Sequence, residues 1–280
     1  MTTDPALRVS APWLQLREAA DTAARSLALA SRAARYVAAR PGAGDEPSVV
    51  YDLGSGTGAM ARWLAPLLPG PQHWVLLDHD EDLLVAADMA YAGRAADGAP
   101  VTIETRPLDL TELEPAHLSG ATMVTASALV DLLTVDELDR IVSTVTALAC
   151  PALVTLSVVG RVRLRPHDPL DPVVAEAFDL HQRRTVAGRT LMGPGALGHL
   201  ATAFARAGAR VVSRPSPWRL TATDAALASE WLSGWVAAAC EQRPELAVMA
   251  APYRERRLAQ AAQGRLRVTV QHGDLWVVPR

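Results

Sequence analysis

The sequence contains no lysine and no asparagine, so all 27 of its basic residues are arginines. The absence of lysine excludes Schiff-base catalysis, a lysine general base and the lysine of a phosphate-binding P-loop. Only two cysteines are present, Cys150 and Cys240, and neither belongs to a Cys-x-x-Cys pair. Two isolated cysteines cannot form a zinc site by themselves, and we predict no metal site.

Long apolar runs and an excess of positive charge are also missing. No stretch of about 18 apolar residues could span a bilayer, and the first residues lack the basic start and apolar core of a signal peptide. Thirty acidic residues outnumber the arginines and give a net charge of −3. The overall field that attracts nucleic acids or anionic membranes is therefore absent. We expect a cytoplasmic protein.

The 280 residues are 50% hydrophobic and 20% charged, a globular composition with ample length for a core. Helical spacing of apolar residues predicts one helix, or two helices with a break, over residues 13–39. Short apolar runs bounded by turn residues predict strands, and these alternate with helices. The strands are expected at 48–53, 72–78, 101–106, 121–126 and 152–159, and the helices at 57–68, 81–94 and 135–149.

Strands that are apolar throughout and alternate with helices are typical of an α/β fold, a parallel sheet with helices on both faces. Residues 160–194 are rich in Arg, Pro and Asp, and we interpret them as an insertion with its own helix at 173–184. A helix at 194–207, a strand at 210–213 and a helical segment at 222–263, broken at Pro244, follow. The last stretch, 266–278, alternates as a strand does, with a bulge near Gly273.

The most informative segment is Val-Val-Tyr-Asp-Leu-Gly-Ser-Gly-Thr-Gly-Ala-Met, residues 49–60. Its strand leads into glycines that open a helix, so a ligand can approach the backbone where free N–H groups point at it. Gly54-x-Gly56-x-x-Ala59 also satisfies the dinucleotide-binding pattern, in which an acid for the ribose lies about 20 residues on, and Asp78 meets that condition.

Two acids separate the two interpretations. Asp52 extends the motif to Asp-x-Gly-x-Gly-x-Gly, and Asp109 follows the third strand in Arg-Pro-Leu-Asp-Leu. With these residues the segment 49–159 resembles class I S-adenosylmethionine (SAM)-dependent methyltransferases, and the rest of the chain offers no recognisable dehydrogenase segment. A glycine turn alone also occurs wherever a strand turns sharply into a helix, and Asp109 could simply cap a short helix.

The resemblance implies roles for the residues that match the family motifs. The turn made by Gly54, Ser55, Gly56 and Gly58 would hold the methionine part of SAM, and Asp52 would orient the turn or the amino group. Asp78 would accept hydrogen bonds from the ribose hydroxyls, with His79, which could equally be a surface residue, beside the adenine. The adenine edge would meet Asp109 and the backbone of Leu110, and the sulfonium would meet the acceptor near Ala126 and Ser127. All these positions follow the carboxyl ends of parallel strands, where open α/β sheets bind ligands.

Methyl transfer from a sulfonium is an in-line displacement that depends mainly on placing the nucleophile in a dry site. A general base helps when the acceptor is a hydroxyl. The candidates are His181 on the inserted helix, Asp131 on the loop after the fourth strand, and His167. A lone histidine on an amphipathic helix is more often a packing residue, and Asp131 could cap the next helix.

Two groups of arginines have alternative interpretations. Arg17, Asp21 and Arg25 share one face of the first helix, which is either a solvated, salt-bridged face or a lid whose Arg17 or Arg25 binds the SAM carboxylate. Arg161, Arg163 and Arg165 lie on one side of an extended segment, where they either protect a sheet edge or bind an anionic group of the substrate.

These observations and the resemblance predict a seven-stranded, mostly parallel sheet with an antiparallel last strand and helices on both faces. A helical lid over residues 1–47 precedes a methyltransferase domain over 48–280, with the insertion after the fifth strand. The first helix, residues 127–132 and the insertion over 161–194 are expected to build the substrate face. The predicted reaction transfers a methyl group from SAM to O, N or C of a small-molecule acceptor and leaves S-adenosylhomocysteine. We expect neither a nucleic acid nor a membrane as a partner, and a homodimer stays open. The alternatives are an NAD(P)-binding oxidoreductase and a SAM-binding protein without activity.

Overall fold

The computed structural model describes residues 9–40, 46–90 and 93–279, with side chains of residues 88–90 excepted. The turn predicted over residues 41–47 therefore lies mostly outside the described residues, as does part of the helix predicted over 81–94. Within the described ranges, no helix combines the length and the apolar character needed to cross a membrane.

The main sheet has the strand order β3-β2-β1-β4-β5-β10-β8, and β9 pairs with β10 beside this path. The first five strands are parallel, and β10 runs antiparallel to both β5 and β8. The predicted mostly parallel sheet with an antiparallel last strand is thus confirmed. The predicted number of seven strands is wrong, because the short β9 adds an eighth within the described residues. The strands are β1 (Ser48–Leu53), β2 (Gln72–Asp78), β3 (Val101–Pro107), β4 (Met123–Ser127), β5 (Ala152–Arg165), β8 (Arg210–Pro215), β9 (Trp218–Leu220) and β10 (Arg267–Val278).

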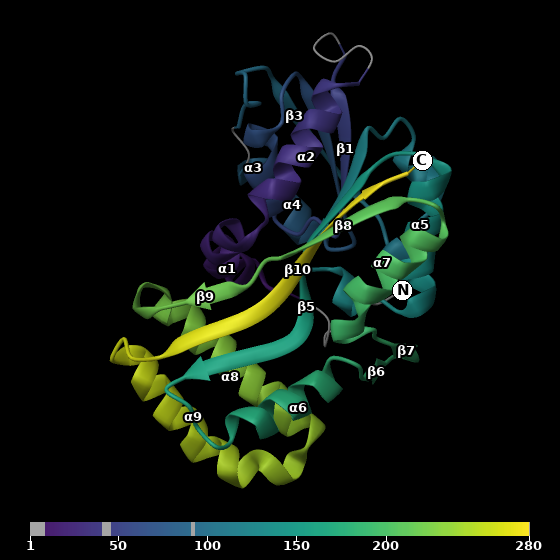
Figure 1. Cartoon of the computed structure of the whole chain (residues 1–280). Coiled ribbons are helices and arrows are strands. Elements are labelled where there is room, and N and C mark those ends of the chain that lie inside the picture. Colours follow the sequence, from purple (N-terminus) through teal and green to yellow (C-terminus); the bar gives the residue numbers. More distant parts are fainter. Residues whose placement is uncertain (1–8, 41–45, 91–92, 280) are drawn as a thin grey trace.

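The helices cover both faces of the sheet (Figure 1). One face packs against α2, α3 and α4 and the other against α5 and α7. A further apolar cluster joins α6, α8 and α9 to the far ends of β5, β9 and β10. The helices are α1 (Ala11–Ala24), α2 (Leu27–Ala38), α3 (Ala59–Leu64), α4 (Glu81–Ala90), α5 (Val135–Ala147), α6 (Asp171–His181), α7 (Ala196–Arg206), α8 (Ala225–Gln242) and α9 (Ala247–Ala262).

The N-terminal segment forms two helices with a break, one of the two possibilities predicted for residues 13–39. Helix α1 ends at Ala24 and α2 begins at Leu27, and the two residues between them are extended, with ψ of 140° at Arg25 and 102° at Ser26. The Ser26 hydroxyl accepts the Leu29 N–H and caps α2. The break turns the chain and places Arg25 next to the carboxyl ends of the strands.

The predicted insertion begins as a continuation of β5, which was expected to end at residue 159. Figure 1 shows β5 and β10 running together beyond the rest of the sheet, over α6, α8 and α9. Val162 and Leu164 pack into the apolar cluster of those helices, while Arg161, Arg163 and Arg165 are exposed on the opposite side. Their predicted alternation is confirmed. The segment is a strand despite its polarity because every second residue is buried.

Three short strands escaped the sequence analysis. β9 is three residues long and lies just after prolines at 215 and 217, so it is too short to be recognised by alternation. β6 (Thr185–Val186) and β7 (Arg189–Thr190) form a two-stranded hairpin inside the insertion. Three residues of this hairpin, Val186, Ala187 and Arg189, line a cavity.

Candidate functional site

The glycine turn lies between β1 and α3 and has the conformation that its sequence predicts. Gly54, Gly56 and Gly58 have φ of +59°, +52° and +77°, values that residues with side chains rarely adopt. A Cβ atom on Gly54 would lie 2.6 Å from Leu129 Cδ1, and one on Gly56 would lie 3.0 Å from Leu14 Cδ1. The turn therefore requires glycine both for its backbone and for its close neighbours.

This close packing predicts that Gly54→Ala destabilises the protein by about 2–4 kcal/mol, from the left-handed backbone and the contact with Leu129 together. Gly98 is the matched control, because it has φ of +83° and no atom within 4 Å of an added Cβ. Gly98→Ala should cost only the backbone part, about 1–2 kcal/mol. Urea unfolding measures both, and equal losses in the two variants would contradict the contact with Leu129.

Asp78, at the end of β2, braces the turn. Its Oδ2 accepts the Gly56 N–H at 2.8 Å, its Oδ1 accepts the Asp80 N–H at 3.0 Å, and His79 Nδ1 lies 3.4 Å from Oδ1. A carboxylate offers about four acceptor positions. Asp78 therefore keeps acceptor capacity for a ligand in the cavity that it lines.

Asp109 follows β3 and caps a short 3-10 helix, the alternative role that the sequence left open. Its Oδ1 accepts the backbone N–H of Thr111 at 2.9 Å and the Thr111 hydroxyl at 2.8 Å. Its Oδ2 accepts no hydrogen bond from the part of the chain that the structure describes, and Asp109 also lines the cavity with Leu110. Capping thus leaves one carboxylate oxygen for a ligand.

Asp52 lies at the inner end of the site and is 1% exposed. Its Oδ1 accepts the Thr125 hydroxyl at 2.7 Å. Burial raises the pKa of Asp52 to about 7, because the charged carboxylate is poorly solvated there. A cationic group beside it would reverse this effect and favour the charged form.

Arg25 is the least satisfied polar side chain of the site. It is only 4% exposed, and its Nη2 donates to Ser127 Oγ at 3.1 Å. Its Nε and Nη1 find no acceptor among residues 9–40, 46–90 and 93–279. The guanidinium also lies 5.4 Å from the centre of the Trp63 ring, and burial lowers the pKa of Arg25. A buried guanidinium with free N–H groups favours an anionic ligand.

Arg17 and Asp21 form an ion pair that faces inward. Arg17 Nε donates to Asp21 Oδ2 at 2.9 Å, and Trp218 Nε1 donates to Asp21 Oδ1 at 2.9 Å. Arg17 also stacks on Trp218 at 4.9 Å. The interpretation of this helix face as solvated is therefore wrong, because α1 packs against β9 and Asp21 is 5% exposed.

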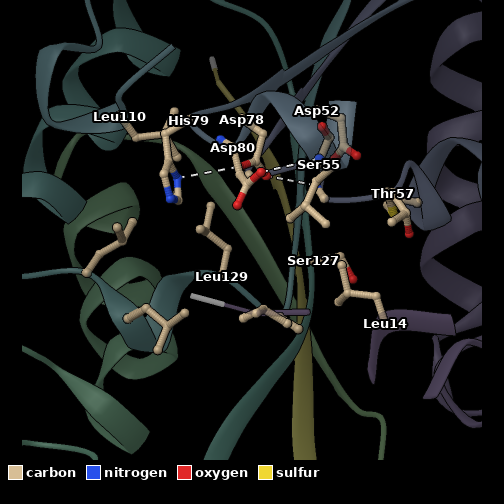
Figure 2. A pocket seen from close by; sticks show the side chains of 18 of the residues that line it. Leu14, Asp52, Ser55, Thr57, Asp78, His79, Asp80, Leu110, Ser127 and Leu129 are labelled. Atoms are coloured by element: carbon tan, nitrogen blue, oxygen red, sulfur yellow. Dashed lines mark hydrogen bonds and ion pairs between the residues drawn. The ribbon is translucent and has the colours of Figure 1, made fainter. Parts of the chain in front are cut away.

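These residues surround one cavity of about 320 Å³. Figure 2 shows Asp78, His79 and Leu110 around one end, Asp52 and Ser55 beside the glycine turn, and Ser127 near Leu14 of α1. Of the residues predicted to bind the cofactor, those lining the cavity are Arg17, Arg25, Asp52, Gly54, Ser55, Gly56, Asp78, His79, Asp109, Leu110 and Ser127. Gly58 lies just behind the turn as the N-cap of α3, and Ala126 is buried in the core.

The three candidate bases lie outside the lining of this cavity. Asp131 is half-buried next to the lining residue Leu132, and burial raises its pKa to about 6. His181 is held between Glu241, at 3.1 Å from Nε2, and Arg184, at 3.2 Å from Nδ1. His167 is exposed. The structure therefore does not bring these three residues together.

The segments expected at the substrate face supply most of the apolar lining of the cavity. The inserted helix α6 packs on α8, and no described residue of α6 lines the cavity. The β6–β7 hairpin contributes instead, and its Arg189 is fixed by two hydrogen bonds to Glu137, at 2.9 and 2.7 Å. The first helix contributes Leu14, residues 127–132 contribute Leu129 and Leu132, and the insertion contributes Val186, Ala187 and Arg189, whereas Leu133 lies outside the segments expected at the substrate face. The hairpin turn contains Gly188, a residue type typical of turns, with φ of +80°.

No protein-family model and no curated protein matches the sequence. The YcgJ protein from Bacillus subtilis is similar in structure, with 11% identity over 91% of this chain and 99% of that chain and a TM-score of 0.48. A SAM-dependent methyltransferase from Geobacter sulfurreducens, solved with S-adenosyl-L-homocysteine, has 16% identity over 98% and 100% of the two chains and a TM-score of 0.43. The cyclopropane synthase MmaA2 from Mycobacterium tuberculosis has 13% identity over 90% and 83% and a TM-score of 0.45. At such values, the function has to be argued from the residues of this chain.

Proposed function

We propose that this chain is a SAM-dependent methyltransferase that acts on O, N or C of a small molecule. The observation that carries the proposal is Arg25, whose buried guanidinium keeps two unpaired nitrogens at one end of a cavity. The other end holds the acceptor oxygens of Asp78 and Asp109, and the glycine turn lies between the two ends. A ligand with a carboxylate at one end and a nucleoside at the other fits this order of groups.

Each polar part of SAM has a matching group in the cavity. The free N–H groups of Arg25 suit the carboxylate, as a charge-assisted pair. Asp52 is a buried partner for the neighbouring ammonium, and Asp78 can accept hydrogen bonds from ribose hydroxyls. The free oxygen of Asp109 suits the amino group of the adenine, with Leu110 as an apolar neighbour.

Two features weigh against a dinucleotide in the same place. Dinucleotide-binding sheets have the order 3-2-1-4-5-6 with parallel strands, whereas here the antiparallel β10 lies between β5 and β8. Helix α3 is only six residues long, so its dipole offers little to a pyrophosphate. These features support the methyltransferase over the NAD(P)-dependent oxidoreductase.

The chemistry asks little more of the chain. A sulfonium bound between the glycine turn and Ser127 would face the apolar side chains of Leu14, Leu129 and Leu132, which exclude water. Methyl transfer then depends on holding the acceptor in line with the methyl group. Among the candidate bases Asp131 is nearest to the cavity wall in the chain, and with a pKa of about 6 it is mostly ionised at neutral pH.

The direct test is calorimetric titration of the purified protein with SAM, S-adenosylhomocysteine, NAD and NADP. We expect saturable binding of the first two and none of the nicotinamide cofactors. Binding of NAD or NADP alone would overturn the proposal in favour of the oxidoreductase. Mass spectrometry of candidate acceptors incubated with SAM then separates an enzyme, which yields methylated products, from a protein that only binds SAM.

The raised pKa of Asp52 predicts that ligand binding releases a proton. The ligand ammonium should lower this pKa well below 7, so below pH 7 a protonated Asp52 must ionise on binding. At pH 6.5 we expect release of somewhat less than about one proton, and an affinity for S-adenosylhomocysteine that rises between pH 5.5 and 7. Calorimetry in buffers of different ionisation enthalpy measures the release. Asp52→Asn should abolish it, and release that persists in this variant would exclude Asp52 as its source.

A further inference from the structure

One buried carboxylate near the site, Asp274, does not line its cavity. It belongs to β10 and is 0% exposed. The register of β10 shifts between Gly273 and Leu275, which leaves Asp274 irregularly paired with β5 at this point. Its neighbour across the sheet, Leu156, has φ of +57° and turns its N–H toward the carboxylate. Irregular backbone in both strands therefore sets the position of the Asp274 carboxylate and of the Leu156 N–H that it binds.

The carboxylate of Asp274 joins three separate segments. Its Oδ2 accepts the Ser26 N–H at 2.7 Å, and its Oδ1 accepts the Leu156 N–H at 2.8 Å and the hydroxyl of Ser216. A buried carboxylate with three donors is well satisfied, and charged hydrogen bonds of this kind are among the stronger ones. The α1–α2 break is therefore tied to the sheet at Ser26.

Ser26 directly follows Arg25, so the tie fixes the residue with the unpaired guanidinium. On its other side, the Arg25 N–H donates to Asp21 O at the end of α1. The backbone around Arg25 is thus fixed from both sides, although its extended conformation is not part of either helix. A guanidinium poised for one carboxylate needs such a support, because a shift of about 1 Å at a binding group loses much of its contribution.

We propose that Asp274 is a positioning residue for ligand binding: through the Ser26 N–H it holds the α1–α2 break so that Arg25 faces the carboxylate of SAM. The inference rests on the proposed function, because it gives Arg25 that ligand. It goes beyond the proposed function in assigning the task to a residue that touches no ligand.

The test removes one N–H group. Arg25 has φ −55° and ψ 140° and Ser26 has φ −73°, so proline fits the backbone at position 26 and the preceding residue tolerates it. Ser26→Pro replaces the N–H bound to Asp274 by a ring CH₂ group, which displaces the carboxylate, and it also deletes the hydroxyl cap of α2. Ser26→Ala deletes only the cap, so the difference between the two variants reports the loss of the tie together with the displacement of the Asp274 carboxylate.

The measurement compares two ligands by calorimetry. S-adenosylhomocysteine carries a carboxylate, and 5′-methylthioadenosine has the same nucleoside and sulfur but no amino acid part. We expect Ser26→Pro to weaken binding of S-adenosylhomocysteine about tenfold or more and that of 5′-methylthioadenosine less than about twofold, which are 1.4 and 0.4 kcal/mol by the usual conversion of affinity to free energy. Ser26→Ala should change neither.

An equal loss for both ligands would show a merely structural role and overturn the proposal, as would unchanged binding of S-adenosylhomocysteine in Ser26→Pro. If Ser26→Pro does not fold, Asp274→Ala replaces it, because it removes the acceptor of the Ser26 N–H. Ser216→Ala is then the control, since it removes one bond to Asp274 and leaves the Ser26 contact intact. Wild-type protein that binds neither ligand would refute the proposed function itself, a result distinct from any of these.

Discussion

Replacing Arg25 by methionine should weaken binding of S-adenosylhomocysteine by about 2–4 kcal/mol, or about 30- to 700-fold, because a buried charge pair with the ligand carboxylate is lost. The same change should raise the free energy of unfolding of the ligand-free protein by about 1–2 kcal/mol, since methionine fills the space without an unpaired buried charge. Titration calorimetry and urea unfolding measure the two effects.

Ligand binding should weaken while the stability of the ligand-free protein increases, and this combination makes the prediction specific to Arg25. Ser127, which loses its Arg25 partner, still receives a hydrogen bond from Thr155 at 3.0 Å, so the variant leaves no new unpaired group there. Binding of 5′-methylthioadenosine should change by less than about threefold, or less than about 0.7 kcal/mol. If Arg25→Met loses affinity for both ligands and stability together, Arg25 is a structural residue and its free nitrogens have no ligand.

Replacing Asp78 by asparagine should weaken binding of both ligands alike, by about 30- to 150-fold, or about 2–3 kcal/mol. The charged acceptor for the ribose hydroxyls is lost, and the contact between Asp78 and the Gly56 N–H is weakened. Asp82→Asn is the matched control, because it removes the same charge from an exposed position in the first turn of α4. A loss confined to S-adenosylhomocysteine would place Asp78 at the amino acid end of the ligand and contradict the assignment.

Local sequence indicated well where the glycine turn and the acids of the cavity lie. Asp52 and Asp78 lie at the ends of β1 and β2, the glycines follow β1 and Asp109 follows β3, and parallel strands bring their carboxyl ends to one edge of the sheet. Once the strands are recognised in the sequence, the positions of the residues at their carboxyl ends are predicted as well. The local pattern also predicted the last strand and the bulge near Gly273, whereas the antiparallel direction of this strand was implied by the family resemblance.

The rest of the site depends on contacts that the local pattern does not contain. Arg25 was recognised on a helix face, but its burial follows from the break at Ser26, which is bound by Asp274, 248 residues away. His181 was a candidate base because it lies on the inserted helix. The packing of α6 on α8 instead places its side chain against Glu241. The apolar walls of the cavity are formed by leucines and by a two-stranded hairpin. In the sequence, these leucines look like ordinary core residues and the hairpin looks like an ordinary turn.

The break between α1 and α2 has a mechanical consequence. Arg25 lies at the only extended residues between a helix that covers the cavity and a helix that packs on the sheet. A rotation of α1 away from the cavity would turn about these two residues, while the bond between the Ser26 N–H and Asp274 keeps the neighbouring Arg25 beside the sheet. The cavity would then open without displacing the group that we propose for the ligand carboxylate.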